Sequence, residues 1–596
     1  MASKNSLTKS ISVVLCIMLL CFTFFVSAIP AKAADTKKAE MPSGIGYDKV
    51  SETIENYWKE HEKTAAGMVI SVFDRDGVIY SGSFGYSDKE KKIRTDQSTV
   101  FQWGSVSKML IWTSAMQLKE QGKLELDKDI RTYLPEGFLK RLSYEKPITM
   151  LDLMNHTAGF EDIILGVETM YKDDIRSLPD YLREHQPKQV YEPGAVTAYS
   201  NWGASLAAYI IERISGTDYY KYVKENIFNP LKMNNTAIST DLSDNKAVQK
   251  KAAELKYYTN EGESTGEPLR YINLYPAGMC NSDLRDIESF AMGISNPESG
   301  LFKNKETYEE LYSPSYFLGD TKYEVNCHGL WAMEFGENVI GHSGNTSGCT
   351  SCIYFDKKTG AGIAIMTNQS GEYSFCHEMV SMLMGKPEIK AKEDFNGYIV
   401  STRSIFSGPF KVLSIFSSSD VTSDQLANIN ADRCTMQGVD KISVPGADFV
   451  IIGGAEYYGM NIPLYLWTAA VLFAFICLWV KAIGFVRHRK DNIKKPLTRW
   501  TVICCIITIM SLFAAIPGIM SIMSDFTWTE LEYKFWSGTY LAIGVASAAL
   551  IIFGIIAVIR ERLKAKQIVF CSGIMLSLTA VIFNIIYWQL YEFWVI

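Results

Sequence analysis

The chain has 596 residues, with 59 Lys and Arg against 65 Asp and Glu, and is long enough for several domains of about 150 residues each. The charge is unevenly divided: residues 1–460 carry 47 basic and 59 acidic side chains, and residues 461–596 carry 12 and 6. The C-terminal part contains four uncharged runs of at least 24 residues, and a membrane-spanning helix needs about 20. A wholly soluble protein is therefore excluded, and the acidic remainder without basic blocks argues against nucleic acid as a partner. The runs are 457–480, 500–524, 535–559 and 567–591.

The N-terminus has the pattern of an export signal. Lys4 and Lys9 precede an apolar stretch at 11–28, and small residues follow at 31–33. This order is typical of a signal peptide, so we expect residues 1–33 to be one. The alternative is an uncleaved anchor helix over the uncharged residues 10–31. Both interpretations export the residues that follow.

In the exported part, an amphipathic helix is predicted at 47–61 and two strands at 67–86 around the turn at 74–77. A helical pattern covers 105–122, residues 240–270 are polar and rich in turns, and strand-like runs return at 339–342, 350–355 and 362–368. Strands at both ends with helices between them predict one mixed sheet and a helical subdomain over residues 45–385. Residues 386–456 are expected to form a small β-rich juxtamembrane module, followed by a four-helix transmembrane region at 457–596.

Basic residues indicate the orientation of the spans. The loop at 481–499 has seven Lys and Arg and the loop at 560–566 has four, whereas the loop between the middle spans has one lysine against three acids. Short basic loops stay in the cytoplasm, which places everything before residue 457 outside. Six cysteines of this outer part permit disulfides in an oxidising compartment, with the pairing left open. Their spacing does not form a metal site, and neither a metal nor another cofactor is expected.

The first chemical motif is Ser105-Val-Ser-Lys108. Residues three apart lie on one face of a helix, so a lysine amine can reach a serine hydroxyl. Burial and the helix N-terminus disfavour the ammonium form, which makes the lysine a base. The chain has four Ser-x-x-Lys copies, but only this one is followed by a long amphipathic helix. We therefore predict Ser105 as nucleophile and Lys108 as its base.

The second motif is Tyr199-Ser-Asn201, which precedes a helix pattern ending at Gly216. A tyrosine opposite the serine can pass a proton to the leaving group. Two other Tyr-x-Asn copies, at 258–260 and 271–273, lie in or beside the polar stretch and are interpreted as turns.

The third motif is a strand edge with glycines, His342-Ser-Gly344-Asn345, which lets a substrate backbone approach closely. Lys358-Thr-Gly360 is instead interpreted as an exposed hairpin turn. Ser243-Asp-Asn245 is rejected because neither strand nor helix is expected to present it.

In this order, the three motifs resemble the serine hydrolase superfamily of class C β-lactamases, DD-peptidases, D-aminopeptidases and related esterases. The stretches at 153–160, 191–194 and 276–280 are also similar to that family, and the resemblance covers about residues 45–385. It implies an α+β fold, with an antiparallel sheet flanked by helices beside an all-helical subdomain. It also implies that Asn201 holds a substrate amide, that the Ser105 and Asn345 amides form the oxyanion hole, and that the location is a bacterial cell membrane.

His342 replaces the lysine of class C β-lactamases, and His-x-Gly resembles the peptidase and esterase branches. The expected function is a membrane-anchored, extracytoplasmic serine hydrolase that acts through an acyl-enzyme on peptides with D-residues. A β-lactamase or esterase with a β-lactam-like small substrate is the alternative, and a penicillin-recognising sensor without hydrolysis is the second. The transmembrane tail resembles that of membrane-anchored peptidases. The bundle either anchors the enzyme or also holds an amphiphilic substrate near the bilayer.

Overall fold

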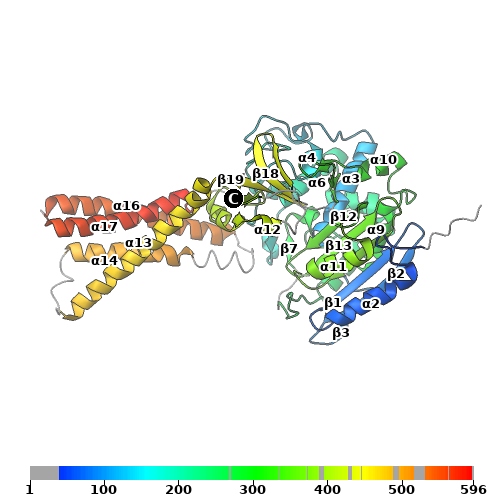
Figure 1. Ribbon diagram of the computed structural model, residues 1–596, viewed down its shortest axis with the longest axis horizontal. Coiled ribbons are helices and arrows are strands. Elements are labelled where there is room, and N and C mark those ends of the chain that lie inside the picture. The colour runs from blue at the N-terminus through cyan, green and yellow to red at the C-terminus, as the bar shows by residue number, and fades with distance from the viewer. Residues whose placement is uncertain are drawn as a thin grey trace, which may run out of the picture.

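The computed structural model describes residues 39–592 except 267–269, 333, 372, 388–394, 427–431, 445, 488–495, 516–529 and 562. A large α/β body carries a bundle of long helices that projects from one side, with a small β sheet between them (Figure 1). The expected signal peptide at 1–33 lies outside the described residues and stays a prediction.

The body is built on a nine-stranded sheet with the order β3-β2-β1-β14-β13-β12-β11-β10-β9. All its paired neighbours run antiparallel. This confirms the antiparallel sheet that the family resemblance implies, and the mixed sheet predicted from the strand pattern was wrong. N-terminal β1 pairs with β14, so the two ends of the folded body meet in the centre of the sheet. The strands are β1 (Gly67–Phe73), β2 (Val78–Asp88), β3 (Ile93–Arg94), β9 (Tyr316–Phe317), β10 (Glu324–Cys327), β11 (Leu330–Trp331), β12 (Val339–Asn345), β13 (Thr350–Asp356) and β14 (Gly362–Thr367).

Both faces of the sheet are covered by helices, because alternate side chains of the central strands are apolar on each side. Met68, Ile70 and Val72 of β1 pack into one cluster with α2 (Val50–His61) and α11 (Tyr373–Met384). Val69 packs on the other face, in the core shared with α9 (Leu284–Ser295) and α3 (Lys108–Glu120). The sheet is therefore a buried layer that holds β12 rigidly beside α3.

Helices between the two groups of strands form the expected helical subdomain. Its centre is α6 (Asn201–Ser215), which packs against α3 and ends at Gly216 in the left-handed conformation, with φ +73°. The other helices are α4 (Met150–Met154), α5 (Leu178–Glu184), α7 (Tyr219–Val223), α8 (Lys246–Ala252) and α10 (Lys305–Tyr312). Short 3-10 or π turns lie at η1 (Tyr47–Lys49), η2 (Gly104–Ser107), η3 (Ile130–Thr132), η4 (Lys172–Asp174), η5 (Lys224–Phe228) and η6 (Tyr275–Ala277), and short strands at β4 (Phe101–Gln102), β5 (Glu168–Thr169), β6 (Thr236–Ala237), β7 (Tyr271–Ile272) and β8 (Asn281–Ser282).

Residues 386–456 contain a second, five-stranded sheet with the order β16-β15-β19-β18-β17. A buried ion pair joins its strands: Lys441 Nζ lies 2.6 Å from Asp448 Oδ2, and both side chains are fully buried. Asp448 Oδ2 also accepts a hydrogen bond from the Thr197 amide at 2.7 Å. One carboxylate thus ties this sheet to the main body. The elements are β15 (Gly397–Ser401), η7 (Pro409–Ser417), β16 (Ser418–Val421), α12 (Ser423–Leu426), β17 (Asp432–Met436), β18 (Val439–Val444) and β19 (Ala447–Ile452).

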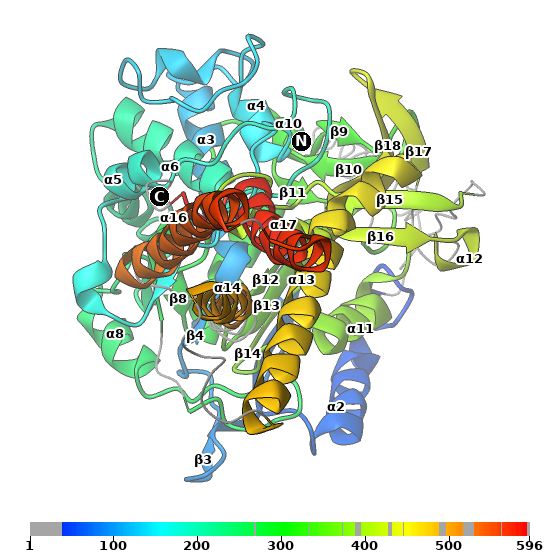
Figure 2. The same cartoon turned by 90° about the vertical axis from the view of Figure 1, so that its left-hand side faces the viewer.

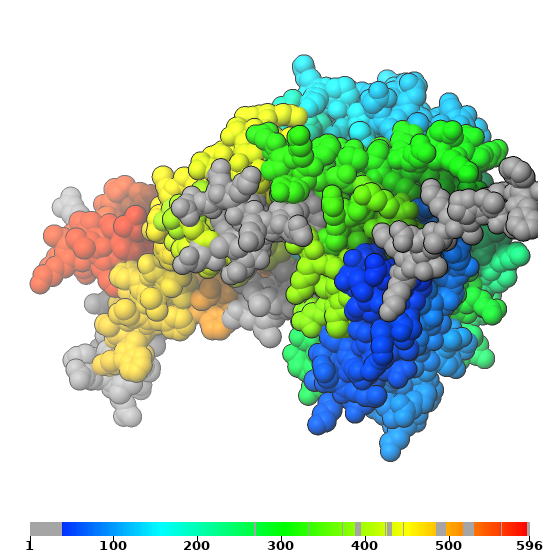
Figure 3. All heavy atoms as spheres, turned by 45° about the vertical axis from the view of Figure 1, so that its right-hand side comes forward, coloured from blue at the N-terminus to red at the C-terminus, as the bar shows by residue number. Residues whose placement is uncertain are grey.

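Four helices in the described C-terminal part are long and apolar enough to cross a membrane. Gly544 faces the last helix, where an added Cβ would lie 3.6 Å from the Ile585 side chain, as expected for small residues at helix contacts. The sequence Pro517-Gly518 predicts a kink in the second span, but both residues lie outside the described part of the chain. Figure 2, which is turned by 90°, shows the four helices together in front of the body, and Figure 3 shows them projecting away from it. They are α13 (Gly454–Arg487), α14 (Pro496–Phe513), α16 (Glu530–Arg560) and α17 (Ala565–Tyr587).

The Lys441–Asp448 pair gives a stability prediction. We expect Asp448→Ala to destabilise the protein by about 3–5 kcal/mol, because removing one partner leaves a buried, uncompensated charge. Thermal unfolding of the detergent-solubilised chain measures this as a lower midpoint. The matched control is Asp440→Ala, which breaks the exposed Arg433–Asp440 pair and should cost about 1 kcal/mol or less. Equal shifts for the two variants would contradict the anchoring role.

Candidate active site

Ser105 and Lys108 lie where the turn η2 continues into α3. Lys108 Nζ is 2.9 Å from Ser105 Oγ and 2.8 Å from the Ala277 carbonyl oxygen. The sequence predicts a helix that starts at Ser105, but the serine lies in a 3-10 turn and the α-helix starts at Lys108. Gly104 is the first residue of this turn and has a left-handed conformation, with φ +52°. A Cβ atom added there would lie 3.0 Å from the Asn345 nitrogen, so a glycine suits this position.

The Lys108 side chain is fully buried. Burial and the nearby Arg403 charge lower its pKa well below the ordinary lysine value, and Asp162 opposes this shift only partly. No carboxylate in the described part of the chain forms an ion pair with it. The surroundings therefore favour the neutral form of the amine, which lies in hydrogen-bond contact with the hydroxyl that it would deprotonate.

Tyr199 lies directly against this pair. Lys108 Nζ is 4.9 Å from the centre of the Tyr199 ring, and the His156 ring packs 4.3 Å away on Tyr199. Burial raises the pKa of Tyr199 to about 12, although contact with Ser105 and the charge of Arg403 oppose the shift. The phenol is therefore protonated at neutral pH and able to donate.

His342 is on β12 and is buried. Burial, with the nearby Lys108, lowers its pKa to about 3. Trp331 Nε1 donates to its Nε2 at 3.2 Å, and its Nδ1 donates to the Ser343 carbonyl oxygen at 2.5 Å. The imidazole is thus neutral and has both nitrogens engaged, so it cannot supply a cation to a substrate.

Gly344 brings β12 against the serine turn. An added Cβ would lie 2.2 Å from the Trp103 carbonyl oxygen and 2.9 Å from the Ser105 nitrogen, so only glycine fits there. The next residue, Asn345, uses its side-chain oxygen to accept from Thr350 Oγ1 at 2.9 Å. Asn201 is the first residue of α6 and is half-buried next to Tyr199. The structure thus brings Ser105, Lys108, Tyr199, His342 and Gly344 together, with Asn345 and Asn201 beside them.

Two charged residues of the site were missed from the sequence. Arg403 reaches it from the segment after β15, with its guanidinium carbon 5.0 Å from the Tyr199 ring centre. Its Nε donates to Asp162 Oδ2 at 2.9 Å. No motif marks either residue, and they are 241 positions apart. The sequence offers no signal for Arg403 beyond its place in the module that is expected to be rich in β-strands.

The five-stranded sheet also supports the segment before Tyr199. Thr402 Oγ1 donates to the Thr197 carbonyl oxygen at 2.5 Å, and Asp448 accepts from the Thr197 amide. Ala195, Val196 and Ala198 are buried against Val439 and Val450 of the same sheet. The position of the tyrosine motif therefore depends on residues 397–452.

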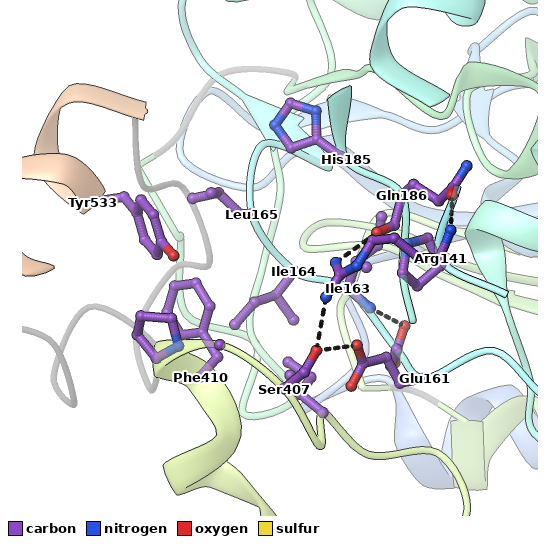
Figure 4. Close-up of a pocket in the computed structure, with 15 residues that line it drawn as sticks. Arg141, Glu161, Ile163, Ile164, Leu165, His185, Gln186, Ser407, Phe410 and Tyr533 are labelled. Atoms are coloured by element: carbon purple, nitrogen blue, oxygen red, sulfur yellow. Dashed lines mark hydrogen bonds between the residues drawn. The ribbon is translucent and has the colours of Figure 1, made fainter. Parts of the chain in front are cut away.

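A separate pocket lies where the body, the segment at 405–410 and the bundle meet. Glu161 accepts from the Phe406 amide at 2.8 Å and from Ser407 Oγ, and Tyr533 of α16 closes the bundle side (Figure 4). Most of its lining is apolar, and Asp162 lies both in this lining and beside Arg403.

The alternative motifs do not reach the site. Lys358 is exposed on the β13–β14 turn, where Asp356 Oδ1 accepts from its amide, as predicted. Ser243-Asp-Asn245 lies at the start of α8, so the expectation that no helix presents it was wrong. The Asn245 side chain caps that helix, and Asp244 Oδ1 accepts a hydrogen bond from the Ser239 amide. Both side chains are therefore used by their own neighbours and not by the site. Tyr258 is buried rather than a turn residue, and its hydroxyl accepts from the Lys89 amide.

The buried cysteines Cys280, Cys327, Cys349, Cys352 and Cys434 are free thiols. Burial raises the pKa of the Cys349 and Cys280 thiols above their ordinary value. A buried thiol with a raised pKa is a weak nucleophile, so these two cysteines are poor alternatives to Ser105.

Two curated proteins are similar to parts of this chain. PbpX of Bacillus subtilis (strain 168), named as a penicillin-binding protein, is 28% identical over 269 residues, covering 44% of this chain and 62% of PbpX. Protein flp of Staphylococcus aureus (strain N315) is 23% identical over 319 residues, which are 52% of this chain and 60% of flp. This chain therefore spans about 60% of the length of these curated relatives.

Two solved structures align with lower similarity. The octameric penicillin-binding protein homologue from Pyrococcus abyssi is 19% identical, with a TM-score of 0.47 over 68% of this chain and 99% of that one. D-amino acid amidase from Ochrobactrum anthropi SV3 is 23% identical, with a TM-score of 0.45 over 56% and 97%. The family model described as Beta-lactamase matches residues 50–377, more than half of the chain and the part that holds all three motifs. The chain therefore belongs to the Beta-lactamase family of serine hydrolases.

Proposed function

We propose that the protein is a membrane-anchored serine hydrolase that cleaves peptides containing D-residues through an acyl-enzyme. The observation that carries this is the buried Lys108 amine, which lies 2.9 Å from Ser105 Oγ, has no ion-pair partner among the described residues and is next to a protonated Tyr199. The relationship to a protein named as a penicillin-binding protein supports a peptide or β-lactam-like substrate.

In the proposed reaction, Ser105 Oγ forms a bond to the substrate carbonyl carbon while its proton passes to Lys108 Nζ. Tyr199 donates its proton to the leaving nitrogen as the C–N bond breaks, and regains one from the Lys108 ammonium. The proton of Ser105 thus ends on Tyr199, and the released amine carries the proton that Tyr199 gave up. Water then attacks the ester and restores the serine. The Ser105 and Asn345 amides are proposed to stabilise the oxyanion and Asn201 to hold a substrate amide.

We propose that the catalytic body lies outside the membrane, with residues 386–456 as its link to the bundle. The starts of α13 and α16 and the end of α17 lie beside the body in Figure 1, and the ends of α13 and α16 and the starts of α14 and α17, between which the basic loops fall in the sequence, lie at the far end of the bundle. Basic loops stay cytoplasmic, which supports a multi-pass bacterial membrane protein with an external catalytic domain.

The nucleophile is tested by acylation. We expect a fluorescent penicillin or a fluorophosphonate to label the solubilised full-length protein, with the adduct located on Ser105 by mass spectrometry. Ser105→Ala should abolish labelling with an unchanged unfolding midpoint. Equal labelling of the variant would contradict the proposal. A stable adduct that is not hydrolysed would favour a sensor, and rapid turnover of the β-lactam would favour a β-lactamase.

Lys108 and Lys358 form a matched pair of variants. We expect Lys108→Met to reduce acylation at least ~100-fold, because general-base catalysis contributes about 10²–10⁴-fold. Lys358→Met should change it less than about twofold, because this lysine lies on an exposed turn. The acylation rate at one probe concentration measures both. Inactivation by Lys358→Met together with an active His342→Ala variant would show that the third motif has been wrongly assigned.

The acylation rate should rise with pH through the pKa of Lys108 and reach its plateau well below pH 10.5, because burial and Arg403 lower that pKa. Arg403→Gln removes a positive charge near Lys108, so the pKa of Lys108 should rise. The rising part of this variant's pH–rate profile should therefore move to higher pH. His156 and His342 also face Lys108, but their lowered pKa values keep them neutral across this range. A pH–rate profile measures the shift, and a limb that stays fixed or moves to lower pH would contradict the assignment of Lys108.

A further inference from the structure

The third motif leaves the site without a cation for a charged substrate. His342 is neutral, buried and hydrogen-bonded through both nitrogens. Lys108 is also buried, and its amine is engaged by Ser105 Oγ and the Ala277 carbonyl oxygen. A negatively charged group of a substrate therefore needs a partner from outside the three motifs.

Arg403 is placed to be that partner. Its guanidinium carbon lies 5.0 Å from the Tyr199 ring centre, and its side chain is 47% exposed. Asp162 engages Nε alone, and the two terminal NH₂ groups make no hydrogen bond within the described part of the protein. Two parallel N–H donors on a planar group match the two oxygens of a carboxylate.

The arginine is also fixed in position. Asp162 Oδ1 accepts from the Ile163 amide at 2.9 Å, and the Asp162 amide donates to the Ser404 carbonyl oxygen at 3.0 Å. On the other side, buried Thr402 bonds Thr197. Arg403 is thus held between two residues that are tied to the catalytic body, so little side-chain freedom remains to be lost when a ligand binds.

We propose that Arg403 is a substrate-binding residue that takes the carboxylate of an amino-acid leaving group, which makes the enzyme a carboxypeptidase for peptides with a free C-terminus. The proposal rests on the proposed acyl-enzyme function. Tyr199 protonates the leaving nitrogen, and in an amino acid the carboxylate is on the carbon next to that nitrogen. A guanidinium over the ring of the same tyrosine lies within reach of it.

A competing explanation is that Arg403 acts only through its charge on Lys108 and Tyr199. That effect is the same for every substrate, whereas carboxylate binding is lost when the carboxylate is removed. Two probe peptides distinguish these explanations: an N-acetylated peptide ending in D-Ala-D-Ala, and the same peptide with a C-terminal amide. Both release one residue through the same bond cleavage.

The experiment measures kcat/KM of the solubilised full-length protein on both peptides, at a pH on the plateau of each variant. We expect Arg403→Gln to lower the value for the free acid by roughly 10–100-fold, the usual size for a hydrogen-bonded ion pair. The amide should change less than about threefold, and Arg403→Lys should recover part of the loss on the acid alone. Arg433→Gln, an exposed arginine of the same sheet, is the matched control and should leave both values unchanged.

An equal loss on acid and amide would overturn the proposal in favour of the electrostatic role. No loss on either peptide would also overturn it, while leaving the acyl-enzyme function intact. A wild-type protein that cleaves neither peptide, with Ser105 unlabelled by the acylation probes, would instead overturn the proposed function and this inference together. An unchanged unfolding midpoint of Arg403→Gln separates a binding defect from loss of the sheet contact.

Discussion

The site depends on an amine buried without an ionic partner. An isolated ammonium in a low-dielectric interior is costly, so such a group loses its proton instead. Among the described residues, the Lys108 amine has the Ser105 hydroxyl and the Ala277 carbonyl oxygen as its hydrogen-bond partners. A neutral amine can make both contacts, because it keeps two N–H donors and has a lone pair. The Tyr199 ring lies beside the amine and packs with the rings of His156 and Trp331, and the neutral His342 adds no charge. Burial itself is therefore what would make Lys108 a base.

The second sheet completes this enclosure rather than only joining two parts. Through Asp448 and Thr402 it forms hydrogen bonds with both the amide and the carbonyl of Thr197, two residues before Tyr199. Through Arg403 it places a positive charge beside Tyr199. A single segment, residues 402–403, thus contributes to the position of the tyrosine and to its electrostatic environment. We expect a chain truncated after residue 385 to retain Ser105 and Lys108 but to hold Tyr199 poorly.

The features that could be predicted from the sequence are those that a short segment of chain determines. Ser105 and Lys108 are one turn apart, and the turn at Lys358 is set by its neighbours, so both could be read from short segments. The strand order was not predictable, because pairing of β1 with β14 joins residues about 300 positions apart. The helix α8 was missed because its seven residues bury only Val248 and Ala252, too few for a visible period. Arg403 was missed because its partners, Asp162 and Tyr199, are brought to it only by the docking of the second sheet.

The same docking bears on whether the bundle only anchors the enzyme. Beyond Arg403, the chain passes Glu161, which bonds the Phe406 amide, and then reaches the bundle. There Gln589 accepts from the Gly408 amide at 2.5 Å, and Lys411 donates to the Tyr587 carbonyl oxygen at 3.1 Å. Phe410 packs on Tyr533 with ring centres 5.6 Å apart. An anchor needs only a covalent link to the enzyme. Here the segment 402–411 also forms hydrogen bonds with α17 at one end and with Thr197, two residues before Tyr199, at the other. Separating the bundle from the body would break contacts on the segment that carries Arg403, which makes the bundle part of the support of the active site.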